Sequence, residues 1–137
     1  NFQRSNGKLP TILENKSCVT VADVDHDGDS DLFVGNLADP KAYGVPQTSF
    51  LLINDGKGNF SVAPQSIIAL SHLGMVTSAS FADVNKDGWK DLVVCGEWMP
   101  LTIFINNKVY VYFSFFAIIN SRLRIFNITI NIIFYIR

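Results

Sequence analysis

Cysteine is scarce in this chain, which has only two, Cys18 and Cys95, among 137 residues. Two cysteines cannot form the disulfide framework that stabilises many small secreted domains. No feature of the sequence indicates that the two residues approach each other, so we expect a pair of buried free thiols. The composition is 48% hydrophobic and 17% charged, which is typical of a globular domain and argues against disorder.

An excess of basic charge is absent as well, because 11 Lys and Arg residues stand against 12 Asp and Glu residues, for a formal net charge of −1. A nucleic-acid-binding domain favours a clearly basic surface, so we expect no nucleic-acid partner. The sequence also lacks a G-x-S-x-G, P-loop or dinucleotide-binding pattern, and His72 has no partner at a metal-ligand spacing. We therefore expect no enzyme activity from this chain.

Acidic residues are few but strongly clustered, since nine of the 12 lie in three short glycine-containing loops. Two of these loops belong to an internal duplication: residues 22–34 read A-D-V-D-H-D-G-D-S-D-L-F-V, and residues 82–94 read A-D-V-N-K-D-G-W-K-D-L-V-V. Eight of these 13 positions are identical at an offset of 60 residues, where chance would give about one match. Residues 50–54 correspond to residues 102–106 at an offset of 52, so the first repeat contains eight additional residues in the preceding loop.

Short apolar runs of strand length surround these loops, at residues 18–22, 32–34, 50–53, 60–62, 78–82, 92–95 and 101–105. The glycine-rich segment 54–59 predicts the turn of a β-hairpin. No stretch of residues 1–107 has a convincing helical period. Three or four short strands in a repeat of 50 to 60 residues is the spacing of propeller blades. The predicted fold is all-β, a partial β-propeller of roughly one and a half to two four-stranded antiparallel blades.

The first acidic loop, residues 23–31, reads D-V-D-H-D-G-D-S-D and has side-chain oxygens at positions 1, 3, 5 and 9. Calcium takes about six to eight hard oxygen ligands, and alternate residues of a tightly curled loop can turn their carboxylates toward one point. Gly28, at position 6, permits the sharp backbone turn that this requires. We predict that Asp23, Asp25 and Asp27 bind calcium through their side chains. Asp29 is predicted to bind through its backbone carbonyl, and Asp31 through a bidentate carboxylate.

The second loop, residues 83–91, reads D-V-N-K-D-G-W-K-D. Its predicted ligands are four side chains and one carbonyl: Asp83, Asn85, Asp87 and Asp91, with the carbonyl of Trp89. Because Asn85 removes one negative charge, we expect weaker binding at this site. The alternative is a solvated acidic turn without metal, but the Asp and Gly spacing recurs at matching repeat positions. A helix-loop-helix calcium site is excluded, because position 12 of the two loops is Val34 or Val94, within apolar strand-like runs.

Three segments carry a resemblance to a known family: V-A-D-V-D-H-D-G-D-S-D-L-F-V-G, L-L-I-N-D-G-K-G-N-F and F-A-D-V-N-K-D-G-W-K-D-L-V-V-C-G-E-W-M-P. Residues 1–107 resemble the FG-GAP or VCBS repeats, which include integrin-α-type propellers, and especially their cartilage-acidic-protein-like branch. The resemblance implies calcium-binding hairpins that join propeller blades on secreted or cell-surface proteins. It further implies roles in adhesion and ligand binding, without catalysis by the repeat itself.

Residues 108–137 have a different character, with eight Ile, five Phe, three Tyr and three Asn but no Gly, Pro, Asp or Glu. We therefore divide the chain into a repeat segment, 1–107, and an atypical tail, 108–137. The hypothesis we favour for the tail is a translated AT-rich segment that follows a frameshift or gene truncation. Genuine edge strands are an alternative, since Ile128, Ile130 and Ile132 alternate with polar residues. A membrane anchor is a third, although its apolar run is shorter than the about 20 residues of a spanning helix.

Together these patterns predict a calcium-binding, non-catalytic propeller segment of a secreted or cell-surface protein, for adhesion or ligand recognition. Extracellular modules bind calcium at about 10⁻⁴–10⁻³ M, which suits an extracellular location. Expected partners are the remaining blades of a longer parent chain and an extracellular protein or glycan. The alternatives are an accessory propeller of an extracellular polysaccharide- or lipid-acting enzyme, or a non-functional gene fragment. No charged segment followed by an apolar stretch opens the chain, so we expect a removed signal peptide or, preferably, a start within a larger protein.

Three further residues or segments are candidates for contacts outside the acidic loops. Residues 36–49, which contain Tyr43, form either a ligand-binding loop or a passive insertion. Residues 98–100, W-M-P, form either a surface patch or a contact with a neighbouring blade. His26 stands where the second repeat has Lys86, so we expect it to be exposed rather than a metal ligand.

Overall fold

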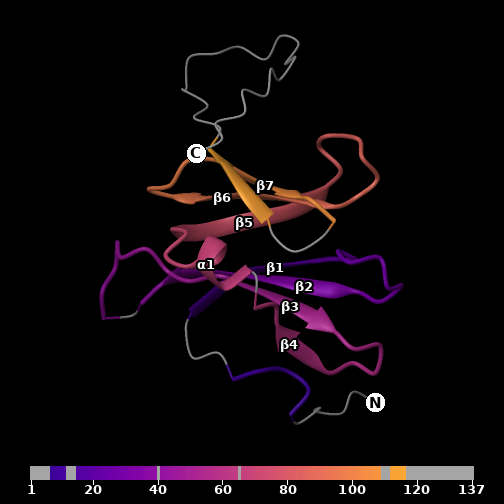
Figure 1. The fold of residues 1–137 in the computed structure, drawn as a ribbon. Coiled ribbons are helices and arrows are strands. Elements are labelled where there is room, and N and C mark those ends of the chain that lie inside the picture. The colour runs from indigo at the N-terminus through magenta and orange to yellow at the C-terminus, as the bar shows by residue number, and fades with distance from the viewer. Residues whose placement is uncertain (1–6, 12–14, 40, 65, 109–111, 117–137) are drawn as a thin grey trace.

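The computed structural model describes residues 7–11, 15–39, 41–64, 66–108 and 112–116. These residues form two four-stranded antiparallel sheets, in the orders β1-β2-β3-β4 and β5-β6-β7-β8, which lie one above the other (Figure 1). The all-β fold of partial propeller blades is therefore confirmed. The elements are β1 (Asn15–Ala22), β2 (Asp31–Ala38), β3 (Phe50–Asn54), β4 (Phe60–Val62), α1 (Ser66–Leu70), β5 (Met75–Ala82), β6 (Asp91–Glu97), β7 (Thr102–Asn106) and β8 (Tyr112–Phe116).

The duplication in the sequence is also a duplication of strand register. Val19 pairs with Val34 in the first sheet, and Ala79 pairs with Val94 at the equivalent place in the second. Each first strand also carries a register shift near its start, just before Cys18 in β1 and between Val76 and Ser78 in β5. Because both sheets repeat the same pairing and the same irregularity, they are two copies of one structural unit.

The apolar core lies between the two sheets. Phe33 and Leu51 of the first sheet, at 0% and 3% exposure, belong to one cluster with Leu92, Val94 and Phe104 of the second, all at 0%. Successive residues of a strand face opposite sides, so each sheet contributes alternate residues to this cluster. Full burial of one such side chain stabilises the fold by about 1.5–3 kcal/mol. The stacking of the sheets is therefore the main source of stability among the described residues.

The two sheets approach each other closely at Gly35 of β2. A Cβ atom at this position would lie 2.7 Å from Val76 Cγ1 and 2.7 Å from Cys18 Sγ, so no larger residue fits without displacement. The hydroxyl of Ser17, in the first sheet, also donates a hydrogen bond to the carbonyl of Val76, in the second sheet. Strands β1, β2 and β5 thus form a tightly packed centre of the interface.

One short helix, α1, lies within residues 1–107, where the sequence has no convincing helical period of adequate length. It spans five residues, and such a length is too short to produce a visible helical period. Leu70 is fully buried in the core, whereas Ile68 is 88% exposed. The Ser49 amide donates to the Leu70 carbonyl at 3.0 Å, which attaches the end of the helix to the connection before β3. The predicted hairpin at 54–59 is confirmed as the β3–β4 turn.

The two cysteines are free, as expected, but the prediction that both are buried is wrong. Cys18 is half-buried and Cys95 is exposed. Cys95 follows Val94, which faces the core with 0% exposure, so the alternation of the strand turns the thiol to the opposite side of the second sheet.

The beginning of the atypical tail contributes a strand to the second sheet. β8 pairs along the whole of β7, from Thr102 opposite Phe116 to Asn106 opposite Tyr112. The segment with Ile128, Ile130 and Ile132 that we considered for edge strands lies outside the described residues. Within the described part of the chain, no helix has the length and apolarity to cross a membrane.

Candidate metal centre

Both acidic loops connect the first two strands of a sheet, the first loop between β1 and β2 and the second between β5 and β6. They lie at the same edge of the stacked sheets as the β3–β4 turn, on the right in Figure 1. This common edge follows from the repeated up-and-down order of the strands. It brings predicted ligands 60 residues apart in the sequence to one side of the molecule.

The first loop is curled by hydrogen bonds from its own backbone to its carboxylates. Asp23 accepts the amides of His26 at 2.7 Å and Gly28 at 3.1 Å, and Asp27 accepts the amide of Asp29 at 2.9 Å. Gly28 has a φ of 94°, in the left-handed region that was expected of it. His26 also has a left-handed φ, of 63°, which no pattern in the sequence indicates.

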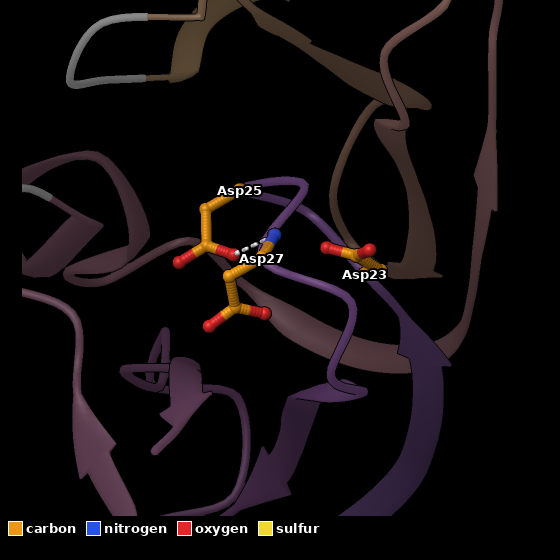
Figure 2. Close-up of side chains that lie close together, drawn as sticks. All are labelled: Asp23, Asp25 and Asp27. Atoms are coloured by element: carbon orange, nitrogen blue, oxygen red, sulfur yellow. Dashed lines mark hydrogen bonds between the residues drawn. The ribbon is translucent and has the colours of Figure 1, made fainter. Parts of the chain in front are cut away.

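Three predicted ligands converge in this loop. One oxygen each from Asp23, Asp25 and Asp27 lies within 4.8 Å of the other two. Figure 2 shows the Asp25 and Asp27 carboxylates next to each other, with Asp23 across the curled loop. Partial burial, together with repulsion from Asp27 and Asp23, raises the pKa of Asp25. Two like charges at such a separation repel by about 1–4 kcal/mol at effective dielectrics between those of water and a protein surface.

The chemistry of this group suits a hard divalent cation. Every donor is a carboxylate oxygen, the ligand type that calcium and magnesium prefer over nitrogen or sulfur. A bound cation would replace repulsion among the three carboxylates by attraction. The donor atoms of this group therefore suit calcium. Calcium requires about six to eight ligands, and the three residues supply part of them.

Asp31 and Asp91, the ninth residues of the two loops, occupy a different environment. Both are fully buried, and each carboxylate accepts two backbone amides. Asp31 accepts from Val24 at 3.0 Å and Asn54 at 2.9 Å, and burial raises the pKa of Asp31. Asp91 accepts from the equivalent pair, Val84 and Asn106, at 2.9 and 2.8 Å.

These two buried carboxylates therefore join each acidic loop to the third strand of its sheet. This supporting role was not predicted. A carboxylate oxygen that accepts one amide retains a second lone pair. The role of Asp31 and Asp91 as cation ligands thus remains a prediction beside their observed hydrogen bonds.

Asp29 directs its side chain toward the β3–β4 turn. A Cβ atom built on Gly56 would lie 2.4 Å from Asp29 Oδ2, so the carboxylate rests against the backbone of that turn. Gly56 has a φ of 73°, which also favours glycine. The side chain of Asp29 therefore packs against a neighbouring turn, and the role of its backbone carbonyl as a cation ligand stays a prediction.

The second loop repeats most of the hydrogen bonds of the first, but its first aspartate accepts the amide of the fifth loop residue instead of the fourth. Asp83 accepts the amides of Asp87 at 3.0 Å and Gly88 at 2.9 Å, and Asp87 accepts the amide of Trp89 at 2.9 Å. The side-chain amide of Asn85 donates to Asp87 Oδ2 at 3.1 Å. The hydrogen bond from Trp89 lowers the pKa of Asp87, with a further contribution from Asn85. These hydrogen bonds curl the second loop as the corresponding bonds curl the first.

Two contacts join the first acidic loop to the second sheet, one with the second acidic loop and one with the end of β7. The His26 ring stacks on the Trp89 ring with centroids 3.9 Å apart and planes 9° from parallel. The side-chain amide of Asn106 donates to the Val24 carbonyl at 2.7 Å and more weakly to the Lys90 carbonyl at 3.4 Å. His26 is exposed, as expected, but it is engaged in this stack. Its partner occupies a different position of the second loop, so only the stacking of the sheets reveals the pair.

In the third acidic loop, the β3–β4 turn, the carboxylate accepts hydrogen bonds from residues of the same turn. Asp55 accepts the side-chain amide of Asn59 at 2.6 Å, the Asn59 backbone amide at 3.0 Å and the Lys57 backbone amide at 2.9 Å. These bonds, led by that from the Asn59 side chain, lower the pKa of Asp55 to about 2. Asp55 thus stabilises the β3–β4 turn.

The stacked four-stranded meanders and their paired acidic loops define the class as a β-propeller-type repeat segment. A protein-family profile described as "FG-GAP-like repeat" matches residues 23–94, just over half of the 137 residues. The chain belongs to the FG-GAP-like repeat family. Searches of curated proteins and of solved structures gave no significant match.

Proposed function

We propose that this chain is a calcium-binding, non-catalytic propeller segment of a secreted or cell-surface protein, serving adhesion or ligand recognition. The observation that carries the proposal is the convergence of Asp23, Asp25 and Asp27 oxygens within 4.8 Å, in a loop whose fold is repeated in the second sheet. Membership of the FG-GAP-like repeat family supports the same function, since calcium-binding hairpins are typical of these repeats.

The proposed role of calcium is structural. In the first loop the ion would be held by Asp23, Asp25, Asp27, the Asp29 carbonyl and Asp31. In the second, it would be held by Asp83, Asn85, Asp87, the Trp89 carbonyl and Asp91. Binding to the folded state alone stabilises it by about 1.4 kcal/mol at a free calcium concentration about ten times the dissociation constant. At the affinities of extracellular modules, about 10⁻⁴–10⁻³ M, such occupancy is reached outside the cell more readily than in the cytosol.

The proposed partners include further blades of a parent propeller. The second sheet covers the face of the first that bears Phe33, whereas the opposite face of β1 leaves Val19 and Val21 58% and 54% exposed. Exposed aliphatic residues on a strand favour burial against another element. Another blade of the same kind would cover these valines, as the second sheet covers the first.

A reciprocal pair of substitutions tests the cation sites in the full chain. Asp25→Asn gives the first loop the same predicted side-chain ligand types as the second, and Asn85→Asp gives the second loop those of the first. Removing or adding one unit charge near a divalent ion should weaken the first site and strengthen the second, each by about tenfold. Calorimetric titration with calcium should give two sites in the wild-type chain and an opposite shift of one site in each variant.

The control is Asp39→Asn, which removes an exposed acidic residue at the end of β2, away from both loops. It should leave both affinities unchanged. The proposal fails if the wild-type chain shows no saturable calcium binding at about 10 mM, which is above the range of extracellular modules. It also fails if the Asp39 variant weakens binding as much as the Asp25 variant, since the effect would then be one of net charge.

A further inference from the structure

A continuous chain of hydrogen bonds joins the two acidic loops, and it begins and ends at their buried aspartates. Asp31 accepts the Val24 amide at 3.0 Å, and the Val24 carbonyl accepts the side-chain amide of Asn106 at 2.7 Å. The backbone amide of Asn106 donates to Asp91 at 2.8 Å. Both aspartates are fully buried and Val24 is 5% exposed, so most of this chain lies in the interior, where hydrogen bonds are electrostatically stronger than in water. The ninth positions of the two loops are therefore connected through Val24 and Asn106 alone.

A stack of two rings forms a second connection between the same loops. His26, at the fourth position of the first loop, packs face to face on Trp89, at the seventh position of the second, with centroids 3.9 Å apart. The His26 amide donates to Asp23 at 2.7 Å, and the Trp89 amide donates to Asp87 at 2.9 Å. Each ring thus belongs to a residue whose backbone is held by an aspartate that we propose as a cation ligand.

A different pair of rings joins the two sheets at the edge opposite the acidic loops. Tyr43, 63% exposed, lies in the connection between β2 and β3, and Trp98, 79% exposed, follows the end of β6. These connections lie on the left in Figure 1. The rings are packed edge to face, with centroids 5.9 Å apart and planes at 79°. The fold therefore brings together two segments that were separate candidates in the sequence, and their part in ligand binding stays a prediction.

We propose that the two cation sites are energetically coupled, so that an ion in either loop raises the affinity of the other loop. This inference rests on the calcium function proposed above and deepens it, because it describes how the two sites regulate each other. Coupling between sites is carried by packed side chains and hydrogen bonds such as those that connect these loops. A loop that its neighbour has already ordered loses less conformational freedom when it binds an ion. Coupling therefore adds a change at the other site to the direct effect of a substitution on its own loop.

Repulsion between the two ions acts in the opposite direction. Two cations on separate loops disfavour double occupancy, but salt at physiological ionic strength screens exposed charges over about 8 Å. The chain of hydrogen bonds and the ring stack are direct contacts, which salt screens much less. Couplings between binding sites typically change affinity by about 5- to 150-fold. We therefore expect positive coupling of at least about fivefold at physiological salt.

The test compares the full ¹⁵N-labelled wild-type chain with Asp25→Ala, titrated with calcium chloride at physiological salt. The Gly28 and Gly88 amides each donate to the first aspartate of their own loop, so their resonances report separately on the two sites. At calcium concentrations that leave the first loop of the variant empty, its second loop should bind at least about fivefold more weakly than in the wild type. Repulsion alone predicts unchanged or tighter binding, because losing one carboxylate removes less negative charge than the missing ion would neutralise.

Two further variants locate the coupling. His26→Asn removes the ring stack and keeps a residue type that tolerates the left-handed φ of 63°. It should lower the coupling factor, the ratio of second-loop affinities without and with Asp25→Ala, by at least about twofold. The matched control is Tyr43→Ala, which removes the aromatic contact between the same two sheets at the opposite edge. This control should leave the coupling factor unchanged.

The outcomes separate this proposal from the calcium function on which it rests. Saturable binding with equal or tighter second-loop affinity in Asp25→Ala overturns the coupling and leaves the calcium function standing, whereas no saturable binding at either loop overturns both. An equal loss of coupling in Tyr43→Ala and His26→Asn also overturns it, because general stacking of the sheets would then carry the effect. If Asp25→Ala does not fold, the wild type decides: the Gly88 titration should be steeper than a single-site curve, and a single-site curve overturns the proposal.

Discussion

Asn106 is the most informative residue for the connection between the two sheets. Its counterpart in the first sheet is Asn54: each is the last residue of a third strand, and each donates its backbone amide to the buried aspartate of its own loop. The side chains differ, because Asn54 donates to Ser30 within its own sheet at 3.2 Å. Asn106 donates across the interface to the Val24 carbonyl at 2.7 Å.

We therefore compare Asn106→Asp with Asn54→Asp. Each substitution removes the amide donor, keeps the side-chain oxygen and adds a negative charge beside a buried aspartate, so the cost of the charge is common to both. Val24 is 5% exposed, and a buried carbonyl left without its donor costs about 1–3 kcal/mol. The Ser30 carbonyl is in an exposed loop and can bond to water instead. Asn106→Asp should accordingly reduce the free energy of unfolding by about 1–2 kcal/mol more than Asn54→Asp.

Urea denaturation at neutral pH in the presence of a calcium chelator, followed by circular dichroism, measures this difference. In thermal unfolding it corresponds to a midpoint lower by about 3–8 °C. Equal losses of stability in the two variants, within about 0.5 kcal/mol, would contradict this prediction, because that is the usual limit for independent effects. A larger loss in Asn54→Asp would likewise show that the bond across the sheets contributes little.

Two further predictions concern the core and the β3–β4 turn. Phe33→Ala should reduce the free energy of unfolding by about 3–5 kcal/mol in urea denaturation, because the ring is fully buried between the sheets. The exposed Ile68→Ala should stay within about 0.5 kcal/mol of the wild type. Asp55 has a pKa of about 2 in the folded chain against an ordinary value of 3.8, so its stabilising contribution is complete above this range and is lost as the pH falls from 3.8 to about 2. Asp55→Asn should flatten the pH dependence of stability in that interval, and an unchanged profile would contradict the assignment.

Much of each repeat could be predicted from the sequence because the relevant signals are local. Alternating apolar residues and the Gly and Asp residues of turns act over a few positions, and they predict β1 to β7 and the hairpin, whereas β8 lies in the segment interpreted as a tail. The curled shape of the first acidic loop followed from Gly28 and the spacing of the aspartates. Helix α1 was missed because five residues fixed by packing leave no periodic signal.

The contacts between repeats could not be predicted, because they depend on how the two sheets stack. The pairing of His26 with Trp89 joins position 4 of one loop to position 7 of the other, and no spacing within a single loop indicates it. The exposure of Cys95 has the same origin, since its side of the second sheet faces away from the first. The burial of Asp31 and Asp91 depends on a third strand that closes over each loop.

The connection between the second and third strands is longer in the first repeat than in the second, so the two blades are not equivalent at this edge. The longer connection of the first repeat supplies Tyr43 and Gly44, against which the tryptophan of the second repeat rests. In the second sheet, β6 and β7 are joined by only residues 98–101. A blade stacked on the side of the second sheet that faces away from the first would therefore meet no long connection of this kind. The contact at this edge therefore joins unlike connections, the longer one of the first repeat and the shorter one of the second.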